Sequence, residues 1–358
     1  MAETEGQTRE VTVEQFREIF ARIREELGKV VVGQADVVER LLAAIFAGGH
    51  VLLKGMPGLG RTLLVKTLAE VLGLEYRRIQ FTPDLLPTDI IGAEVLESNT
   101  STGERTFRFF KGPVFANLLL ADEINRSPTR TQNALLEVMQ ERQVSVSGET
   151  FYLPKPFFLV ATQNTLDTEG VFNLGEAQVD RFLMMIEQGY PDSDSEKRMV
   201  GLTTGARRAE PQRVTCPEEI VAMQALAREV PVVPAVRDFA LAMVRASRPK
   251  EREAAESVKS AVRLGASPRA AQALLLSSKV LALARGRRHV TRQDVVDVVR
   301  PVMAHRVLVD FRARAEGISH DQILESLVTR ARGLGVPEVS RWTREVLRTG
   351  DVMTRKEG

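Results

Sequence analysis

The sequence predicts an α/β fold: a parallel sheet with helices on both faces, followed by a smaller all-helical domain. Short apolar runs alternate with helical patterns between residues 51 and 164, which is typical of buried parallel strands joined by helices. The strand pattern stops after residue 190, and from residue 217 onward apolar residues recur every three or four positions, which indicates helices alone. A chain of 358 residues is long enough for two domains, each with its own core.

The first domain is expected to begin with helices and continue with the alternation of strands and helices. The expected helices cover residues 13–27, 36–47, 63–72 and 132–140. The expected strands cover residues 51–53, 76–80, 118–123 and 158–164. Residues 91–110 alternate around a polar tip, and residues 144–153 alternate around Ser147-Gly148. Both segments therefore predict hairpins inserted into the α/β pattern.

The second domain is expected after residue 190, where the strand pattern stops. The predicted order is a disordered tail over 1–12, a core over 13–190, a helical lid over 191–310 and a partly helical tail over 311–358. Helices are expected over residues 220–230, 236–246, 270–283 and 295–307. Thr291 is expected to cap the last of these, and Ser267-Pro268 supplies a cap and a first helical residue for the third.

A glycine-rich loop joins the first expected strand of the sheet to the next helix. Gly55-Met56-Pro57-Gly58-Leu59-Gly60-Arg61-Thr62 has the spacing of a phosphate-binding loop, with arginine in place of the usual lysine. Glycines let backbone N–H groups surround phosphate oxygens, and the helix N-terminus adds a partial positive charge. Strand, loop and helix together predict a nucleotide site formed by Gly55, Pro57, Gly58, Leu59, Gly60, Arg61, Thr62 and Leu63.

Arg61 keeps the charge of the usual lysine but not its shape. Lysine presents a compact ammonium to the β- and γ-phosphates, whereas a planar guanidinium is wider and forked. We therefore expect nucleotide to bind at Arg61 and hydrolysis to be slower than in a loop with lysine, because phosphoryl transfer depends on positioning.

Two further strands end in polar groups suited to ATP hydrolysis. The apolar run from Leu118 ends in Asp122-Glu123. In a P-loop ATPase, Asp122 would hold Mg²⁺ with the Thr62 hydroxyl, and Glu123 would act as general base. Asn164 ends another buried strand, where its amide could bond the γ-phosphate or the attacking water. Alternatively, it is an ordinary turn asparagine.

With these motifs the chain resembles the MoxR group of AAA+ ATPases, from about Val13 to about Arg306. The distinctive part is Asp122-Glu123-Ile124-Asn125-Arg126 followed by Met139-Gln140-Glu141-Arg142. The family has lysine at the position of Arg61. The other matching segments are Val32-Gly33-Gln34, the phosphate loop, and residues 132–137, 161–164, 176–182 and 265–269.

The resemblance implies roles beyond those of the motifs themselves. Val32, Gly33 and Gln34 would lie over the adenine, and Asn164 would be the sensor-1 asparagine. Arg181 would be the finger that reaches a neighbouring subunit's nucleotide, and Arg269 the sensor-2 arginine of the lid. Arg126 is a second finger candidate or an interface residue. The resemblance also implies ATP and Mg²⁺ as cofactors, a homo-oligomeric ring, expected to be a hexamer, and hairpins directed toward its pore. Alternatively, the hairpins are surface features with no substrate role.

Three functions remain open from the sequence. In the first, an ATP-driven ring remodels or matures other proteins, as relatives of this type do with von Willebrand A domain partners. In the second, the chain is a nucleotide-binding assembly switch with very slow turnover because of Arg61. The third is a nucleic-acid motor, which 49 basic against 47 acidic residues and few aromatics disfavour. Residues 285–289, with three arginines and a histidine, are expected to form a solvated loop; the alternative is a polyanion contact.

Composition also indicates the cellular compartment and argues against disulfides, metal-binding motifs and membrane segments. Cys216 is the single cysteine, so an internal disulfide cannot form, and no metal-ligand spacing is present. No run of about 18 apolar residues occurs, and residues 1–10 are polar rather than signal-like. The sequence therefore predicts a cytoplasmic protein without a membrane segment.

Overall fold

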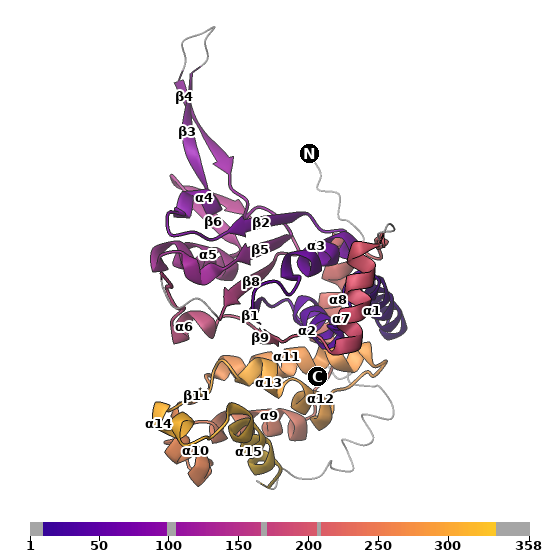
Figure 1. Cartoon of the computed structure of the whole chain (residues 1–358), viewed down its shortest axis with the longest axis vertical. Coiled ribbons are helices and arrows are strands. Elements are labelled where there is room, and N and C mark those ends of the chain that lie inside the picture. Colours follow the sequence, from indigo (N-terminus) through magenta and orange to yellow (C-terminus); the bar gives the residue numbers. More distant parts are fainter. Residues whose placement is uncertain (1–9, 99–104, 166–169, 206–208, 334–358) are drawn as a thin grey trace, which may run out of the picture. The chain divides into compact units, whose positions relative to one another are not determined.

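The computed structural model describes residues 10–98, 105–165, 170–205 and 209–333 (Figure 1). Within these ranges, residues 19–222 form one compact unit that contains the sheet. Residues 11–18 and those from 223 onward form a second, helical unit. The tip of the first expected hairpin, most of the expected N-terminal tail and the end of the C-terminal tail lie outside the described residues.

The sheet unit is built on five parallel strands. Their order is β2 (Tyr76–Gln80), β5 (Leu118–Asp122), β8 (Phe158–Asn164), β1 (Val51–Gly55) and β9 (Met184–Gln188). The parallel sheet and four of its strands are as predicted. The fifth, β9, was not predicted. It pairs with β1 at the edge of the sheet.

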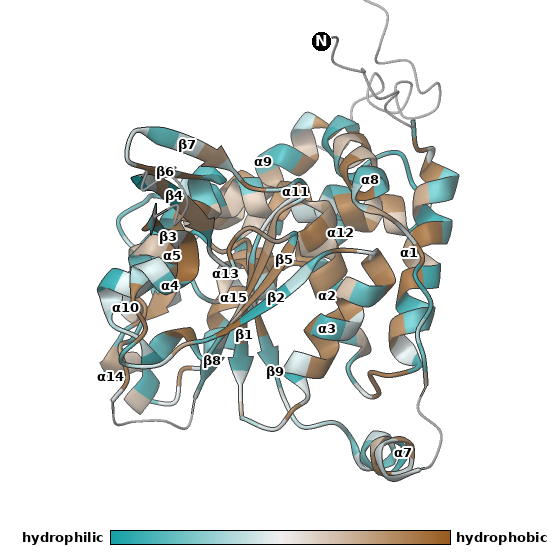
Figure 2. Ribbon diagram, turned by 90° about the horizontal axis from the view of Figure 1, so that it is seen from above, coloured by the Kyte–Doolittle hydropathy of each residue, from teal (hydrophilic) through white to brown (hydrophobic). Residues whose placement is uncertain are grey.

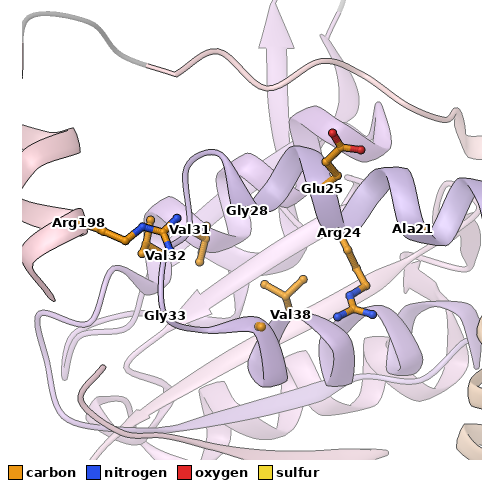
Figure 3. Close-up of a pocket in the computed structure, with 10 residues that line it drawn as sticks. Ala21, Arg24, Glu25, Gly28, Val31, Val32, Gly33, Val38 and Arg198 are labelled. Carbon is orange, nitrogen blue, oxygen red and sulfur yellow. The ribbon is translucent and has the colours of Figure 1, made fainter. Parts of the chain in front are cut away.

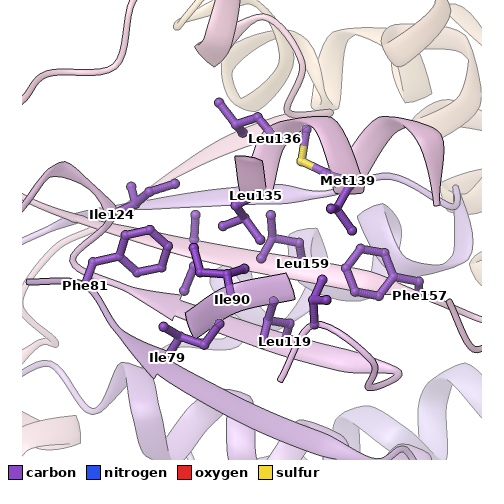
Figure 4. Packing of buried hydrophobic residues seen from close by; sticks show 14 of the residues in the cluster. Ile79, Phe81, Ile90, Leu119, Ile124, Leu135, Leu136, Met139, Phe157 and Leu159 are labelled. Carbon is purple, nitrogen blue, oxygen red and sulfur yellow. The ribbon is translucent and has the colours of Figure 1, made fainter. Parts of the chain in front are cut away.

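Helices cover both faces of the sheet, as the sequence predicts. Figure 2 shows the apolar strands between α2 (Ala35–Phe46) and α3 (Arg61–Leu72) on one side and α4 (Pro87–Ile91) and α5 (Thr129–Glu141) on the other. Fully buried side chains of α5 pack on those of β5 and β8 (Figure 4), namely Leu135, Leu136, Leu119 and Leu159. Burying each such leucine contributes about 1.5–3 kcal/mol, so this layer holds β5 and β8 in place. The unit also contains η1 (Ile124–Arg126), α6 (Glu176–Val179), α7 (Ser193–Thr204), the part of α1 (Val13–Gly28) from residue 19 onward and the start of α8 (Pro217–Glu229).

Both expected hairpins are present. β3 (Gly92–Ser98) pairs antiparallel with β4 (Arg105–Lys111), and β6 (Gln143–Val146) pairs with β7 (Glu149–Tyr152). Figure 1 shows β3 and β4 projecting away from the sheet. The hairpins touch each other, because the Phe109 and Phe151 rings lie 4.6 Å apart and the Ser147 hydroxyl donates to Glu94 Oε2 at 2.6 Å. They therefore form one connected surface feature.

The second unit is helical, with one short strand pair. It contains α9 (Pro234–Ala246), α10 (Glu256–Ala261), α11 (Pro268–Ala284), α12 (Arg292–Asp297), α13 (Val299–Met303), α14 (Phe311–Ala315), α15 (His320–Gly333), and β10 (Val262–Leu264) paired with β11 (Leu308–Val309). Ser267 and Thr291 cap α11 and α12 as predicted. The helix expected over 295–307 is wrong, since it breaks at Val298. Pro301 cannot donate to the Asp297 carbonyl and its ring would crowd that group.

The basic segment 285–289 is not simply a solvated loop. Arg285 Nη1 and Arg287 Nη1 each donate to the fully buried Asp294 carboxylate at 2.7 Å. Burial by itself would raise the pKa of Asp294, but hydrogen bonds from Arg287 and Thr291 hold it below its ordinary value. Two of the cations are therefore neutralised inside the unit, which removes most of the support for a polyanion contact.

Within the described residues, no helix has the length and apolar character needed to cross a membrane.

His50, just before β1, is a buried polar group that the sheet unit uses structurally. Its Nδ1 accepts the Leu159 backbone N–H at 3.0 Å, and its Nε2 lies 3.2 Å from the Met139 carbonyl. A neutral ring protonated at Nε2 satisfies both partners. Burial, with the nearby Arg142 charge, lowers the pKa of His50 to about 3.

We expect His50 to make the sheet unit sensitive to acid. The unfolded chain takes up a proton near pH 6.5, whereas the folded chain does so only near pH 3. Below pH 6.5 the unfolded state therefore binds more protons, and stability should fall by up to about 1.4 kcal/mol per pH unit. Melting temperatures between pH 7.5 and 5 should fall more steeply for the unaltered chain than for His50→Gln. Parallel curves would show that this imidazole does not control the effect.

Candidate active site

The predicted residues of the phosphate loop, the paired carboxylates and Asn164 meet at the carboxyl end of the sheet. The loop after β1 turns into α3 at Arg61, with left-handed backbone at Gly58 (φ 83°) and Gly60 (φ 70°) that favours glycine. A cavity of about 370 Å³ opens there. It is lined by Pro57, Gly58, Leu59, Gly60, Arg61, Thr62, Asp122, Glu123 and Asn164. The structure thus brings the phosphate loop, the paired carboxylates and the amide together.

Strand register explains this convergence. Gly55 is aligned with Asn164 on β8, and β8 also pairs with β5, which carries Asp122. Because all five strands are parallel, their carboxyl ends lie at one edge, where ligands bind in open α/β sheets. Residues far apart in the chain therefore share one cavity.

Asp122 is held from two sides. Its Oδ1 accepts the Thr162 hydroxyl at 2.7 Å, and the same hydroxyl accepts the Glu123 backbone N–H at 2.8 Å. Its Oδ2 accepts Arg78 Nε at 3.0 Å and Nη2 at 2.7 Å. Sequence reasoning missed Thr162 and Arg78. Thr162 could have been found from the sequence, because it is a hydroxyl near the end of an apolar strand, and in the structure it is fully buried. No feature of the sequence around Arg78 indicates its contact with Asp122.

Glu123 has an unusual backbone and two side-chain partners. Its φ of 58° is left-handed, a conformation that costs energy for a residue with a side chain. Gln80 Nε2 donates to its Oε2 at 2.8 Å, and Arg126 Nε lies 3.3 Å from the same oxygen. These contacts fix the direction of the carboxylate at the cavity wall.

The Arg61 side chain is bonded to its own chain. Its Nε donates to Gln188 Oε1 at 3.0 Å, its Nη2 to the Met56 carbonyl at 2.6 Å and its Nη1 to the Gln163 carbonyl at 3.5 Å. Only 8% of Arg61 is exposed. Burial lowers the pKa of Arg61, while the charges of Asp122 and Glu123 oppose that shift. Guanidinium stays charged in proteins, so this site holds a buried cation.

A second cavity lies beside the segment expected to face adenine. It has a volume of about 410 Å³ and is lined by residues of α1, α2 and α7 and of the turn between α1 and α2 (Figure 3). Val32 and Gly33 line it together with Val31, Val38 and Arg198. Gln34 does not line it. Instead its buried amide donates to the Leu59 carbonyl at 3.0 Å, linking this segment to the phosphate loop.

Besides Gln34 and Gly55, three further predicted residues line neither cavity. Leu63 lies in the first turn of α3 and is 46% exposed. Arg181 lies between α6 and β9, and no side-chain hydrogen bond or ion pair is found for it within the described parts of the chain. Arg269 belongs to the helical unit, where its backbone N–H donates to the Ser267 hydroxyl at the start of α11.

The donor groups at the first cavity fit a magnesium nucleotide. Thr62 and Asp122 both line it and offer oxygen atoms, and Mg²⁺ usually takes one or two protein oxygens with water and phosphate oxygens as its other ligands. In the ranges that the structure describes, no group of three or more His, Cys, Asp or Glu side chains is placed so that it could hold a metal ion. Backbone N–H groups at the start of α3 add a favourable environment for phosphate.

Comparisons with known proteins give relatives over most of the chain. The family "ATPase family associated with various cellular activities (AAA)" matches residues 50–184, and the AAA lid domain matches residues 254–327. The lid match continues beyond Arg306, where the motif resemblance ends. Chaperone MoxR1 of Mycobacterium tuberculosis is 42% identical over 88% of this chain and 81% of its own length. Protein MoxR of Methylorubrum extorquens is 31% identical over 82% of this chain and 89% of its own.

A solved structure supports the same fold. The crystal structure of a presumed ATPase from Cytophaga hutchinsonii superposes with a TM-score of 0.82 at 39% identity. The match covers 89% of this chain and 96% of that one. The predicted fold class, a parallel-sheet AAA domain with a helical lid domain, is thereby confirmed.

The Arg78–Asp122 pair leads to a prediction about magnesium. A cation at Asp122 Oδ2 must compete with Arg78, and the arginine charge also repels it. Because Arg78 is 42% exposed and its pair is screened, we expect Arg78→Gln to lower the Mg²⁺ concentration for half-maximal nucleotide binding by about threefold to fivefold. The measurement is a Mg²⁺ titration with a fluorescent ATP analogue.

The neighbouring arginine provides the control. Arg77 pairs with Glu75 at 3.0 Å and does not contact Asp122, so Arg77→Gln should leave the titration unchanged. An unchanged midpoint for Arg78→Gln, or an equal shift for both variants, would contradict competition at Asp122.

Proposed function

This chain belongs to the MoxR family of AAA+ ATPases, and we propose that it hydrolyses Mg-ATP in a homo-oligomeric ring to remodel or mature partner proteins. The observation that carries the proposal is the single cavity lined by the phosphate loop, Asp122, Glu123 and Asn164. Family membership alone would not show that this chain keeps a complete site.

We assign nucleotide binding to the loop from Gly55 to Leu63 and to Val32, Gly33 and Gln34. The loop N–H groups and the positive end of α3 would receive the phosphates, and the cavity beside Val32 and Gly33 would receive the base. Thr62 and Asp122 would hold Mg²⁺. A magnesium ion held there would supply positive charge that stabilises the charge developing on the phosphate oxygens.

We assign the general base to Glu123. Its carboxylate lies at the cavity wall, held by Gln80 and Arg126, and would orient and deprotonate the attacking water. The Asn164 amide would bond the same water or the γ-phosphate. Arg269, in the helical unit, would act on the nucleotide as the arginine of the lid.

The position of Arg181 is an argument for the proposed homo-oligomeric ring. Its side chain lines neither cavity of its own subunit, and within the described residues it has no ion pair that would explain it. A finger acting on the neighbouring subunit would place this cation where charge grows on the transferring phosphoryl group. We propose a hexamer, formed in the presence of ATP.

The client is proposed to be a protein, with a von Willebrand A domain partner. A relative carries the name chaperone. The two hairpins expose large apolar side chains suited to contacts with a polypeptide, among them Val95, Leu96, Phe107 and Tyr152. A nucleic-acid motor has less support, because Arg285 and Arg287 are paired internally with Asp294. The assembly switch with slow turnover remains the alternative, and it depends on Arg61.

Glu123→Gln tests the base. The amide preserves shape but cannot take a proton, so nucleotide should stay bound while turnover falls by at least about a hundredfold. Turnover and binding of a fluorescent ATP analogue are the measurements. Glu70→Gln on α3 removes a carboxylate whose partner is Lys66 and should leave both unchanged. Undiminished turnover in Glu123→Gln would place the base elsewhere.

A mixture of two variants tests whether Arg181 acts on the nucleotide of a neighbouring subunit. Arg181→Ala should bind nucleotide normally but turn over slowly, and Glu123→Gln keeps its finger while lacking a base. In an equal random mixture, about a quarter of the sites combine an intact base with an intact neighbouring arginine, so about a quarter of normal turnover should return. Light scattering should show an oligomer with saturating ATP. A mixture no more active than its components, or a protein that stays monomeric, would exclude the trans role.

A further inference from the structure

Gln188 is a buried polar residue at the end of β9 that no sequence motif includes. It is 3% exposed, and strand register places it opposite Gly55, the first residue of the phosphate loop. Its Oε1 accepts Arg61 Nε at 3.0 Å. Its Nε2 donates to the Leu59 carbonyl at 3.0 Å and to Gln34 Oε1 at 2.7 Å. One amide therefore connects Arg61, the middle of the loop and the segment next to the second cavity.

The neighbouring backbone at Gly55, Met56 and Gln163 completes the site that holds the Arg61 guanidinium, which we call its seat. A Cβ at Gly55 would lie 3.1 Å from Arg61 Nη2 and 2.3 Å from the Gln188 carbonyl, so glycine leaves room for both. The Met56 and Gln163 carbonyls accept from Nη2 and Nη1. Each guanidinium nitrogen thus has an acceptor that belongs to the protein.

This arrangement answers a physical problem that arginine creates in the loop. A buried guanidinium cannot lose its proton, and leaving its donors without partners would cost stability. Gln188 supplies an acceptor without a negative charge, so the cation is satisfied but not neutralised. A lysine has no donor at the Nε position and could not bond Gln188 and Met56 in the same fork geometry.

We propose that Gln188 is a positioning residue for nucleotide binding that adapts the phosphate loop to arginine. It holds the Arg61 guanidinium in its seat and, through Leu59 and Gln34, fixes the loop and the adenine-side segment against each other. Arg61 then acts as an anchor of the loop and a source of positive charge at the cavity wall. The proposal rests on the proposed ATPase function for its nucleotide measurement, but not for its test in the free protein.

The experiment is a double-mutant cycle on the full chain with Gln188→Met, Arg61→Lys and the double variant. Methionine keeps the length of glutamine but removes its hydrogen bonds. Melting temperature of the free protein is the first readout, and the Kd for Mg-ATP from calorimetry is the second. Gln293→Met on α12, where the amide bonds only Asp297 among the described residues, is the matched control and should leave the Kd unchanged.

We expect the effects to be non-additive in both readouts. Gln188→Met should weaken Mg-ATP binding at least about fivefold when residue 61 is arginine and by a clearly smaller factor when it is lysine. The lysine form has already lost the contact between residue 61 and Gln188, so only the bonds of Gln188 to Leu59 and Gln34 remain to be lost. Equal losses in both backgrounds would overturn the proposal, since Gln188 would then act independently of Arg61. So would an unchanged Kd in Gln188→Met.

Failure of the proposed function would look different. If the unaltered chain bound no Mg-ATP, the ATPase assignment would fall, while coupling in melting temperature would still support the Arg61–Gln188 contact. Additive changes in melting temperature would overturn that contact whether or not nucleotide binds.

Discussion

The register of β1 between β8 and β9 is the constraint on which the site depends. It aligns Gly55 with Asn164 on one side and with Gln188 on the other. Because side chains in a strand alternate between faces, a shift of one residue would reverse the direction of each of these groups. The buried apolar residues of β1 and β8 fix that register. Packing of the core therefore determines which polar groups surround the phosphate loop.

Charge at this edge of the sheet is closely balanced. Arg78 and Arg126 pair with Asp122 and Glu123, which gives each carboxylate a cation before any ligand is bound. Arg61 is different, because its acceptors are an amide and two carbonyls, all neutral. The field of its guanidinium is therefore not cancelled by a direct partner. The uncancelled charge of Arg61 would favour binding of an anionic ligand, and a Mg²⁺ ion at the proposed Asp122 site would have to compete with Arg78.

Sequence motifs predicted the parts of the site that are local in the chain. Each of these parts ends or follows a buried strand, namely Gly55 to Thr62, Asp122-Glu123 and Asn164. Parallel pairing of the strands brings them together. The missed residues depend on pairing between distant strands. Arg78 reaches Asp122 because β2 lies beside β5 with Gln80 opposite Asp122, and one sequence does not specify that register. β9 could have been found, since Met184-Met185-Ile186 is an apolar run before Tyr190-Pro191. The sequence does not show which strand β9 pairs with, so the role of Gln188 could not have been predicted.

A structure of the chain with Mg²⁺ and a non-hydrolysable ATP analogue tests the central claim most directly. The distance from Arg61 Nε to Gln188 Oε1 is the quantity to measure, and in this structure it is 3.0 Å. We predict that this hydrogen bond persists, with Nη2 still bonded to the Met56 carbonyl and the phosphates received by the loop N–H groups. A guanidinium that leaves Gln188 and bonds the β- or γ-phosphate directly would contradict it.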